Sequence, residues 1–162
     1  MSNYRIRKAE VCDLAELGRI YDAARQFMRN NGNPHQWQGG YPQKELLLSD
    51  IRRGALYAVL KEGILHGVFY FAVEEDPTYH RIYDGDWLSN APYGVIHRIA
   101  SDGSGGIFAA ALAFCSEKTN HLRIDTHADN NPMQHVVEKH GFHRCGIIYV
   151  SDGSPRIAYE KV

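Results

Sequence analysis

Hydrophobic residues recur along the chain with two different periods, and each period predicts a different kind of element. Between residues 14 and 28 the apolar side chains are spaced three or four positions apart, which is typical of a helix with one buried face. Asp13-x-x-Glu16 at the start of this stretch is a capping box, and the sequence NNGNP at residues 30–34 ends the helix. The run from 55 to 75 instead predicts two strands joined by a turn at Glu62-Gly63.

Shorter patterns of the same two kinds predict the remaining elements. In chain order they are a strand at 3–10, a helix from Pro42 to Gly54, a central strand at 93–100, a helix at 106–118, a strand at 121–127, a helix capped by Asn130 or Asn131 and ended by Gly141, and a hairpin of 142–150 with 156–162. The whole order is β-α-α-β-β-β-α-β-α-β-β. It predicts an α/β sandwich, with a mostly antiparallel sheet flanked by helices.

Length and composition place the chain among ordinary globular proteins. Its 162 residues, 44% of them hydrophobic, are enough for one domain with a buried core, spanning residues 1–162. A formal net charge of −1 provides no basic surface for nucleic acid, and no apolar run reaches the roughly 20 residues of a membrane helix. The three cysteines are too few for a disulfide framework, and the first residues lack the apolar core of a signal peptide. We therefore expect a cytoplasmic protein.

The tetrapeptide Ser-Asp-Gly-Ser occurs twice, and the surroundings of the two copies differ. At 151–154 it lies between two strand runs, and we expect a hairpin turn with no further role. At 101–104 it follows the central strand, continues into Gly105-Gly106 and opens a helix. The first amides of a helix are unpaired and lie at the positive end of its dipole. This first copy therefore predicts a binding site for a pyrophosphate.

A strand, this glycine-rich loop, a helix and a second strand precede the segment DNNPMQHVVEKHGF at residues 129–142. The succession resembles the GNAT superfamily of N-acetyltransferases, in motifs from Ile96 to Tyr159 and in element order over most of the chain. The resemblance implies transfer of an acetyl group from acetyl-CoA to a primary amine of a small molecule or peptide, by direct attack in a ternary complex and without a metal ion. The coenzyme would lie between the strands that end at Ala100 and begin at His121. The residues that the resemblance assigns to coenzyme binding are Ile99, Ala100, Ser101, Gly103, Ser104, Gly105, Gly106, Ile107, Asn130 and Met133.

Three positions depart from the usual pattern of that superfamily. Gly103 stands where the loop usually has Gln or Arg, and Phe108 stands at a position for a small residue, where we expect it to pack under the helix. Val137 replaces a tyrosine that protonates the departing coenzyme A thiolate in many members, and valine has no proton to donate. We expect Tyr149, on the strand after residues 141–142, to be the replacement acid; the alternative is an aromatic side chain that only packs on the sheet.

Acetyl transfer to an amine requires a base for the amine and a polarised thioester carbonyl. The resemblance places the polarising backbone amide near Ile99. Strand alternation puts His97 on the same face as Ile99, with Arg98 and Ala100 on the other face. An imidazole with an ordinary pKa of about 6.5 suits proton transfer, and a purely structural histidine is the alternative. Arg98 is expected to pair with Asp125 across the diverging strands.

The acceptor is expected to bind against loops of the N-terminal half and against the strand at 121–127. Trp37 and Tyr41 lie between the first two helices, and Trp87 precedes the central strand. These aromatic side chains form either a binding wall or a lid packed on the core. Asp125 and His127 alternate onto one face of their strand, either as a proton relay or as a hydrogen-bonded polar pair.

Other classes of function fit parts of the sequence. A GNAT fold that binds acyl-CoA without transferring the acyl group, as a sensor or regulatory module, would account for Val137. His140-x-x-His143-x-Cys145 does not match the spacing of a zinc site, and it crosses from a helix into a strand. Because dimers are frequent in the superfamily, the chain is also a candidate homodimer.

Overall fold

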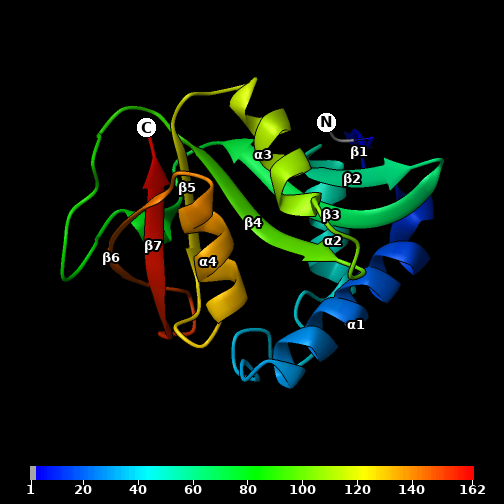
Figure 1. Cartoon of the computed structure of the whole chain (residues 1–162), viewed down its shortest axis with the longest axis horizontal. Coiled ribbons are helices and arrows are strands. Elements are labelled where there is room, and N and C mark those ends of the chain that lie inside the picture. The colour runs from blue at the N-terminus through cyan, green and yellow to red at the C-terminus, as the bar shows by residue number, and fades with distance from the viewer. Residues whose placement is uncertain (1–2) are drawn as a thin grey trace.

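Seven strands form one mixed β-sheet in the computed structural model, which describes residues 3–162 (Figure 1). In spatial order they are β1 (Arg5–Lys8), β2 (Leu56–Lys61), β3 (Ile64–Val73), β4 (Gly94–Ser101), β5 (Leu122–Thr126), β7 (Pro155–Lys161) and β6 (His143–Tyr149). Neighbouring strands are antiparallel except β4 and β5, which are parallel. This mostly antiparallel sheet confirms the predicted fold class.

Helices cover both faces of the sheet, and a hydrophobic cluster lies on each side. One face carries α1 (Leu14–Asn30) and α2 (Lys44–Arg52), and the other carries α3 (Ile107–Ser116) and α4 (Asn131–Lys139). In Figure 1 α3 and α4 lie in front of the sheet. Two short 3-10 helices, η1 (Val11–Asp13) and η2 (Pro77–Tyr79), complete the elements of the described residues. The predicted order of helices and strands is confirmed.

The β2–β3 hairpin turns at Glu62 and Gly63, as predicted. Their φ angles are 53° and 78°. Two consecutive residues with positive φ are typical of a type I′ turn, whose twist matches that of the flanking strands. The second predicted hairpin, β6–β7, is also present.

The start of α1 differs from the predicted capping box of Asp13 and Glu16. The reciprocal box instead joins Glu10 to Asp13 across η1. The Asp13 carboxylate accepts the Glu10 amide at 2.7 Å and pairs with the Arg7 guanidinium at 2.8 Å. The hydrogen bond from Arg7 lowers the pKa of Asp13. The prediction was wrong because the Asp13 carboxylate pairs with Arg7 of β1 and accepts no hydrogen bond from the first amides of α1.

A long loop, residues 76–93, crosses the end of the sheet on its way from β3 to β4. The two ends of the loop meet, because the Asp76 amide donates to the Tyr93 hydroxyl at 2.9 Å. The middle of the loop pairs with β6, where Tyr83 and Ile147 exchange backbone hydrogen bonds of 2.8 and 2.7 Å. The loop is therefore fastened both to itself and to the edge strand of the sheet.

Glu160 on β7 holds the same loop from inside the protein. Its side chain is fully buried, and its carboxylate accepts hydrogen bonds from Arg123 at 2.8 Å, from His121 and from the Leu88 amide. Burial raises the pKa of Glu160, but the hydrogen bonds from His121 and Arg123 outweigh it, and the pKa lies below its ordinary value. One carboxylate therefore joins β5, β7 and the 76–93 loop.

Replacing Glu160 with alanine should destabilise the protein by about 3 kcal/mol, because the substitution leaves the Arg123 guanidinium buried without a counter-ion. Urea unfolding monitored by circular dichroism measures the free energy. Glu138→Ala, which removes an exposed carboxylate of α4, is the matched control and should change it by less than about 0.5 kcal/mol. Equal unfolding free energies for the two variants would show that the Glu160 network does not stabilise the loop.

Candidate active site

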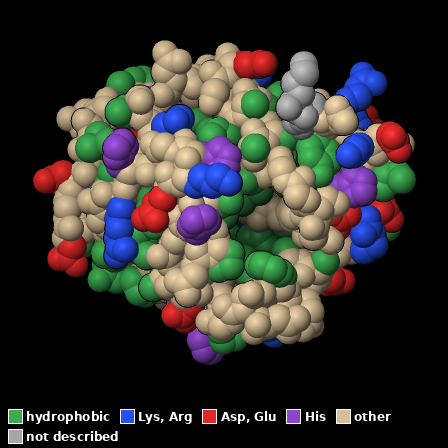
Figure 2. Space-filling model, viewed as in Figure 1, with side chains coloured by type: hydrophobic (Ala, Val, Ile, Leu, Met, Phe, Trp, Pro, Cys, Tyr) green, Lys and Arg blue, Asp and Glu red, His purple; other side chains and the backbone are tan. Residues whose placement is uncertain are grey.

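A cavity of about 580 Å³ opens where β4 and β5 diverge. Its walls come from the end of α1 and the loop after it, from β3, β4 and β5, from the start of α4 and from the β6–β7 turn. The residue after α2, residues 76–78 and the start of β7 complete them. Figure 2 shows the surface hollowed near the middle of this face, between α4 and α1, with hydrophobic side chains in the hollow. The cavity lies where the resemblance predicted the coenzyme and the acceptor.

The divergence of β4 and β5 exposes strand backbone inside the cavity. The two strands pair only over residues 94–95 and 122–123. Beyond that point they separate, and Ile96, Ile99 and Ile124 line the cavity. The edge of an unpaired strand presents free N–H and C=O groups. A ligand that carries amide groups can therefore bind in the gap as an added strand would.

A β-bulge in β4 changes the direction of its side chains. Arg98 has a φ of 50°, and the pairing of β4 with β3 is irregular at this point, so β4 contains one extra residue. Alternation predicted that Ile99 shares a face with His97. Ile99 instead packs with the cluster under α3 and α4, while Ala100 joins the cluster under α1 and α2. The prediction was wrong from Arg98 onward, because the bulge shifts the alternation by one residue.

Arg98 is held by groups from both helices of its face. The Tyr21 hydroxyl of α1 donates to the Arg98 carbonyl at 2.7 Å. The Arg98 guanidinium donates to the buried Asp50 carboxylate of α2 at 2.9 Å and to the Tyr41 hydroxyl at 3.3 Å. The predicted pair of Arg98 with Asp125 is therefore wrong, because Asp50 neutralises the arginine on the α2 side.

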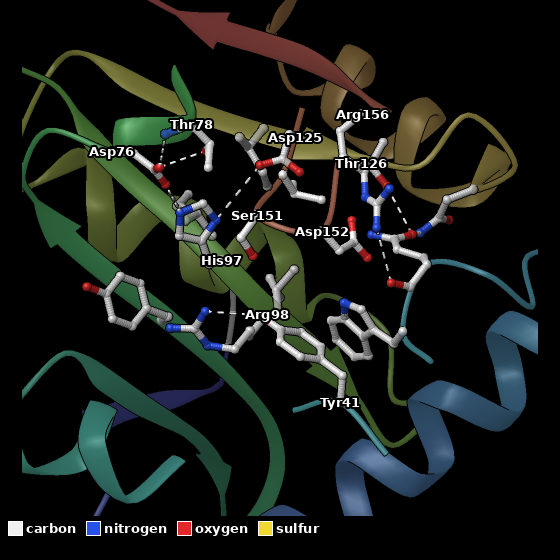
Figure 3. A pocket seen from close by; sticks show the side chains of 18 of the residues that line it. Tyr41, Asp76, Thr78, His97, Arg98, Asp125, Thr126, Ser151, Asp152 and Arg156 are labelled. Atoms are coloured by element: carbon white, nitrogen blue, oxygen red, sulfur yellow. Dashed lines mark hydrogen bonds and ion pairs between the residues drawn. The ribbon is translucent and has the colours of Figure 1, made fainter. Parts of the chain in front are cut away.

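His97 lies between two carboxylates that come from different elements (Figure 3). Its Nε2 is 2.7 Å from an Asp76 oxygen, and its Nδ1 is 3.9 Å from an Asp125 oxygen. Burial raises the pKa of Asp76, but hydrogen bonds from His97 and Thr78 outweigh it and lower the pKa to about 2. An ionised Asp76 holds the proton of a neutral imidazole on Nε2, which leaves a lone pair on Nδ1. His97 is thus oriented to accept a proton on the side of Asp125.

Asp125 bonds to Tyr79 and not to His127. The Tyr79 hydroxyl donates to the Asp125 carboxylate at 2.6 Å. His127, which lies outside the cavity lining, accepts the Asp129 amide on its Nδ1 at 3.0 Å. The predicted relay or polar pair of Asp125 with His127 is therefore wrong, because each side chain has a different partner. Asp125 remains a carboxylate of the cavity wall beside His97.

The glycine-rich loop after β4 leaves the amides at the start of α3 free. Gly106 has a φ of 82° and stands at the N-cap of α3. The first amide of this helix to bond within the protein is that of Ala110, and no group of residues 3–162 accepts a hydrogen bond from amides 105–109. A Cβ at Gly105 would meet nothing within 4 Å, so the space in front of this backbone is open. The loop has the free donors that a pyrophosphate requires.

Side chains brace the beginning of this loop. The Ser101 hydroxyl accepts the Gly103 amide at 3.1 Å and donates to the Ser104 carbonyl at 3.0 Å. The Asp102 carboxylate accepts the Ser104 amide at 3.0 Å and lies 2.8 Å from Nδ1 of His66 on β3. The amides of Gly103 and Ser104 are therefore used within the loop, and the amides that follow them are available to a ligand.

The cavity brings together only part of the predicted site residues. Those that line it are Trp37, Tyr41, His97, Ile99, Asp125, Asn130 and Met133. The other residues predicted to bind the coenzyme, which are Ala100, Ser101 and residues 103–107, lie outside its lining, at the end of β4 and the start of α3. The Asn130 side chain caps α4 by accepting the Met133 amide at 3.1 Å, as the sequence predicted.

Trp87 and Tyr149 lie outside the cavity lining and pack against the protein. The Trp87 ring stacks on the Arg123 guanidinium at 4.0 Å, and its indole N–H donates to the Tyr79 carbonyl at 2.9 Å. Trp87 is therefore the packed alternative and not a binding wall. Tyr149 is half exposed and meets the ring of Tyr83 edge-on. The prediction that Tyr149 points into the cleft as an acid is wrong, because its side chain faces the loop before β4.

The second Ser-Asp-Gly-Ser turns the chain beside the cavity. It joins β6 to β7 as predicted, but Val150, Ser151 and Asp152 also line the cavity. The expected hairpin turn is confirmed. Sequence reasoning also missed Asp76 and Arg156, two charged residues of the cavity wall. Asp76 stands in an Asp-Pro-Thr sequence, which signals only a turn, and no local pattern marks Arg156.

Comparison with solved structures identifies the fold. No protein-family model matches the sequence, and no curated protein matches it. A GNAT-family acetyltransferase from Streptococcus agalactiae is 29% identical, with a TM-score of 0.87 over 98% of this chain and 95% of that chain. The chain belongs to the GNAT superfamily. The likeness to GNAT acetyltransferases supports an acyltransferase.

More distant GNAT structures share the same fold. A GNAT-family acetyltransferase from Listeria monocytogenes is 16% identical, with a TM-score of 0.71 over 98% of this chain and 94% of that chain. One from Bacillus anthracis is 16% identical, with a TM-score of 0.68 over 99% of this chain and 95% of that chain. At this level of identity the likeness concerns the fold alone.

The departures from the usual GNAT pattern are visible in the packing. Val137 on α4 is 1% exposed and belongs to the cluster under α3 and α4. Phe108 packs edge-on against His140 and Phe142, which confirms that it lies under the helix. Both side chains therefore fill the core behind the cavity.

Among residues 3–162, no three His, Cys, Asp or Glu side chains come together as ligands of a metal ion. His140 bonds through Nδ1 to the Val136 carbonyl, and the Cys145 thiol donates to the His143 carbonyl. In the same residues, none of the helices has both the length and the hydropathy that crossing a membrane requires.

Asp76 should stabilise the protein in a pH-dependent way. Because its pKa of about 2 in the folded protein is below the ordinary 3.8, its contribution is complete above about pH 4 and is lost as the pH falls through 2. Asp76→Asn should therefore cost about 2 kcal/mol of unfolding free energy at pH 7 and about half of that at pH 3. Urea unfolding at both pH values measures the difference. The neighbouring Glu75→Gln, at an 84% exposed side chain, should cost little at either pH, and a pH-independent cost of Asp76→Asn would contradict the assignment.

Proposed function

We propose that the protein transfers an acetyl group from acetyl-CoA to a primary amine of a small molecule or peptide, by direct attack of the amine on the thioester. The observation that supports this most is the position of His97 between Asp76 and Asp125, in a cavity that borders the open edge of β4. A base, a carboxylate that attracts a cation and unpaired strand backbone are thus present in one place. Acyl transfer to an amine uses all three.

The groups around the gap between β4 and β5 fit acetyl-CoA, which supplies the activated acetyl group. The free amides 105–109 suit its pyrophosphate, because they are aligned at the positive end of the α3 dipole. The unpaired edge of β4 from Ile96 onward suits the amide groups of the pantetheine arm. Asn130 and Met133 lie on the α4 side of the same cavity. These features support the coenzyme as the acyl donor.

Asp125 and His97 act on the amine in succession. An amine reaches the site mainly as an ammonium ion, which the Asp125 carboxylate attracts. Because Nδ1 of His97 and the Asp125 oxygen are 3.9 Å apart, a nitrogen placed between them is within hydrogen-bond distance of both. His97 takes one proton from the nitrogen, and the ionised Asp76 stabilises the resulting imidazolium. The amine is then neutral and nucleophilic.

The neutral amine forms a C–N bond to the carbonyl carbon, and the C–S bond of the thioester breaks. The Ile99 amide, next to the bulge, polarises the carbonyl oxygen, since a bulge leaves backbone groups outside the ladder. The proton that the nitrogen loses on becoming an amide goes to the thiolate, so that coenzyme A leaves as the thiol. The reaction balances without a hydroxyl at the position of Val137.

Val137 also favours a second candidate function, in which the protein binds acyl-CoA as a sensor and transfers nothing. Titration calorimetry with acetyl-CoA, followed by thiol release against a panel of amines, separates the two. We expect binding and thiol release. Binding without release for any amine would support the sensor, and no binding would overturn both functions.

His97→Gln should lower kcat by roughly 100-fold or more, because the amine loses its base. It should leave the affinity for acetyl-CoA unchanged, since the glutamine removes no group that the coenzyme contacts. Thiol release measures kcat, and calorimetry measures the affinity. His80→Gln, at a 58% exposed histidine outside the cavity lining, is the matched control and should have wild-type kcat. Equal kcat for the two variants would remove His97 as the base.

The two tryptophans should report differently on ligands. Trp37 lines the cavity, whereas Trp87 is stacked on Arg123 outside it. Fluorescence should therefore change when an acceptor amine is added to the acetyl-CoA complex of Trp87→Phe, and should stay constant for Trp37→Phe. A fluorescence change in Trp37→Phe, with none in Trp87→Phe, would place the acceptor outside this cavity.

A further inference from the structure

Of the three arginines in the cavity wall, one has no carboxylate partner. Arg53, Arg98 and Arg156 line the cavity. The first two form ion pairs at 2.8 Å with Glu74 and at 2.9 Å with Asp50. Arg156 has no carboxylate of residues 3–162 within the 4.0 Å of an ion pair, since its side chain donates only to backbone carbonyls.

Arg156 is also buried, with an exposed fraction of 7%. Its guanidinium donates to the Pro155 carbonyl at 2.8 Å and to the Gln36 carbonyl at 3.2 Å, which uses two of its five N–H donors. A buried guanidinium without a counter-ion is unfavourable unless a ligand supplies the charge. In Figure 3 the side chain extends into the view from β7, on the opposite side from His97. This geometry indicates a site for an anionic group.

Two titratable side chains lie near Arg156, and neither neutralises it. Asp152 is exposed, and its carboxylate accepts the amide and the hydroxyl of Ser154. Hydrogen bonds from Ser154 and the charge of Arg156 lower the pKa of Asp152. Burial and the charge of Arg156 lower the pKa of His127. The positive charge of Arg156 therefore acts on its surroundings without a direct ion pair.

We propose that the acceptor is an amino acid or another amine with a carboxylate, whose carboxylate binds Arg156 while its amine binds between His97 and Asp125. This deepens the proposed function and rests on it. Arg156 supplies a single positive charge, which matches a monoanion. Asp125 and Asp152 line the same cavity and would repel the second charge of a phosphate. Opposite unpaired charges in one cavity match a zwitterion.

Matched pairs of amines test the proposal directly. Glycine, β-alanine, γ-aminobutyrate and the common α-amino acids are each compared with their carboxamides, which remove the negative charge and keep the carbon chain. The wild-type protein should acetylate the best acid with a kcat/KM roughly tenfold or more above that of its amide, because a bond to a charged group is lost in the amide. The chain length of the best acid reports the spacing of amine and carboxylate. Equal kcat/KM within every pair would overturn the proposal.

Substitution of Arg156 tests the residue. In Arg156→Gln the acid-to-amide ratio of kcat/KM should fall by roughly 10- to 100-fold, mainly through KM of the acid, and Arg156→Lys should keep part of the preference. Arg144→Gln, at an exposed arginine of β6, is the matched control and should keep the wild-type ratio. If Arg156 were purely structural, its substitution would lower the thermal midpoint and reduce kcat/KM for the acid and for the amide by the same factor. That result would overturn the proposal.

A binding measurement separates this inference from the proposed function. Calorimetric titration of the coenzyme A complex with each acid and its amide needs no turnover. Tighter binding of the acid, lost in Arg156→Gln, would support the anion site even if no thiol were released, and acetyl transfer would then be the part that fails. Thiol release with equal binding of acid and amide would instead overturn the anion site and keep acetyl transfer.

Discussion

The early end of the β4–β5 ladder is the constraint on which the cavity depends. Parallel strands that pair over two residues and then separate leave a gap that the protein does not fill. The bulge at Arg98 lies in the part of β4 that no longer pairs with β5, and it is held by Tyr21 of α1 and by Asp50 of α2. A positive φ at a non-glycine residue is unfavourable alone, so these contacts from two helices are what keep it. The helices that cover the sheet thus also define the site.

The electrostatics of the cavity follow one rule, which is that a buried charge has its partner built in or leaves a place for one. Half-buried Arg98 has the buried Asp50 and half-buried His97 has Asp76, and the exposed Arg53 is also paired, with Glu74. Each of these pairs removes a charge that would otherwise attract ligands without selection. The charged side chains that remain unpaired can therefore distinguish one acceptor from another.

Local patterns predicted the helices and strands well, because periodicity and turn residues act over a few positions. Glu62-Gly63 and Asn130 stand where the sequence placed them. Prediction failed where a side chain has a partner far along the chain. Arg98 pairs with Asp50 rather than Asp125, and no residue near Arg98 signals the bulge.

The same limit applies to the site. His97, Trp37 and Tyr41 could be placed in the cavity from strand order and loop composition. Arg156 could not, because its contact with Gln36 joins positions 120 residues apart. The resemblance to GNAT proteins predicted that the glycine-rich loop binds the coenzyme. It did not predict which amides of the loop bond within the loop and which are free.

The 76–93 loop gives the site a stability of its own. It carries Asp76 and Tyr79, the partners of His97 and Asp125, yet it is attached to the rest of the protein through Tyr83 at β6 and Leu88 at Glu160. If these attachments open, both partners leave together while the strand pairs of the sheet stay intact. The orientation of His97 therefore depends on contacts that lie outside the cavity. A residue at the far edge of the sheet can change the chemistry without touching the cavity.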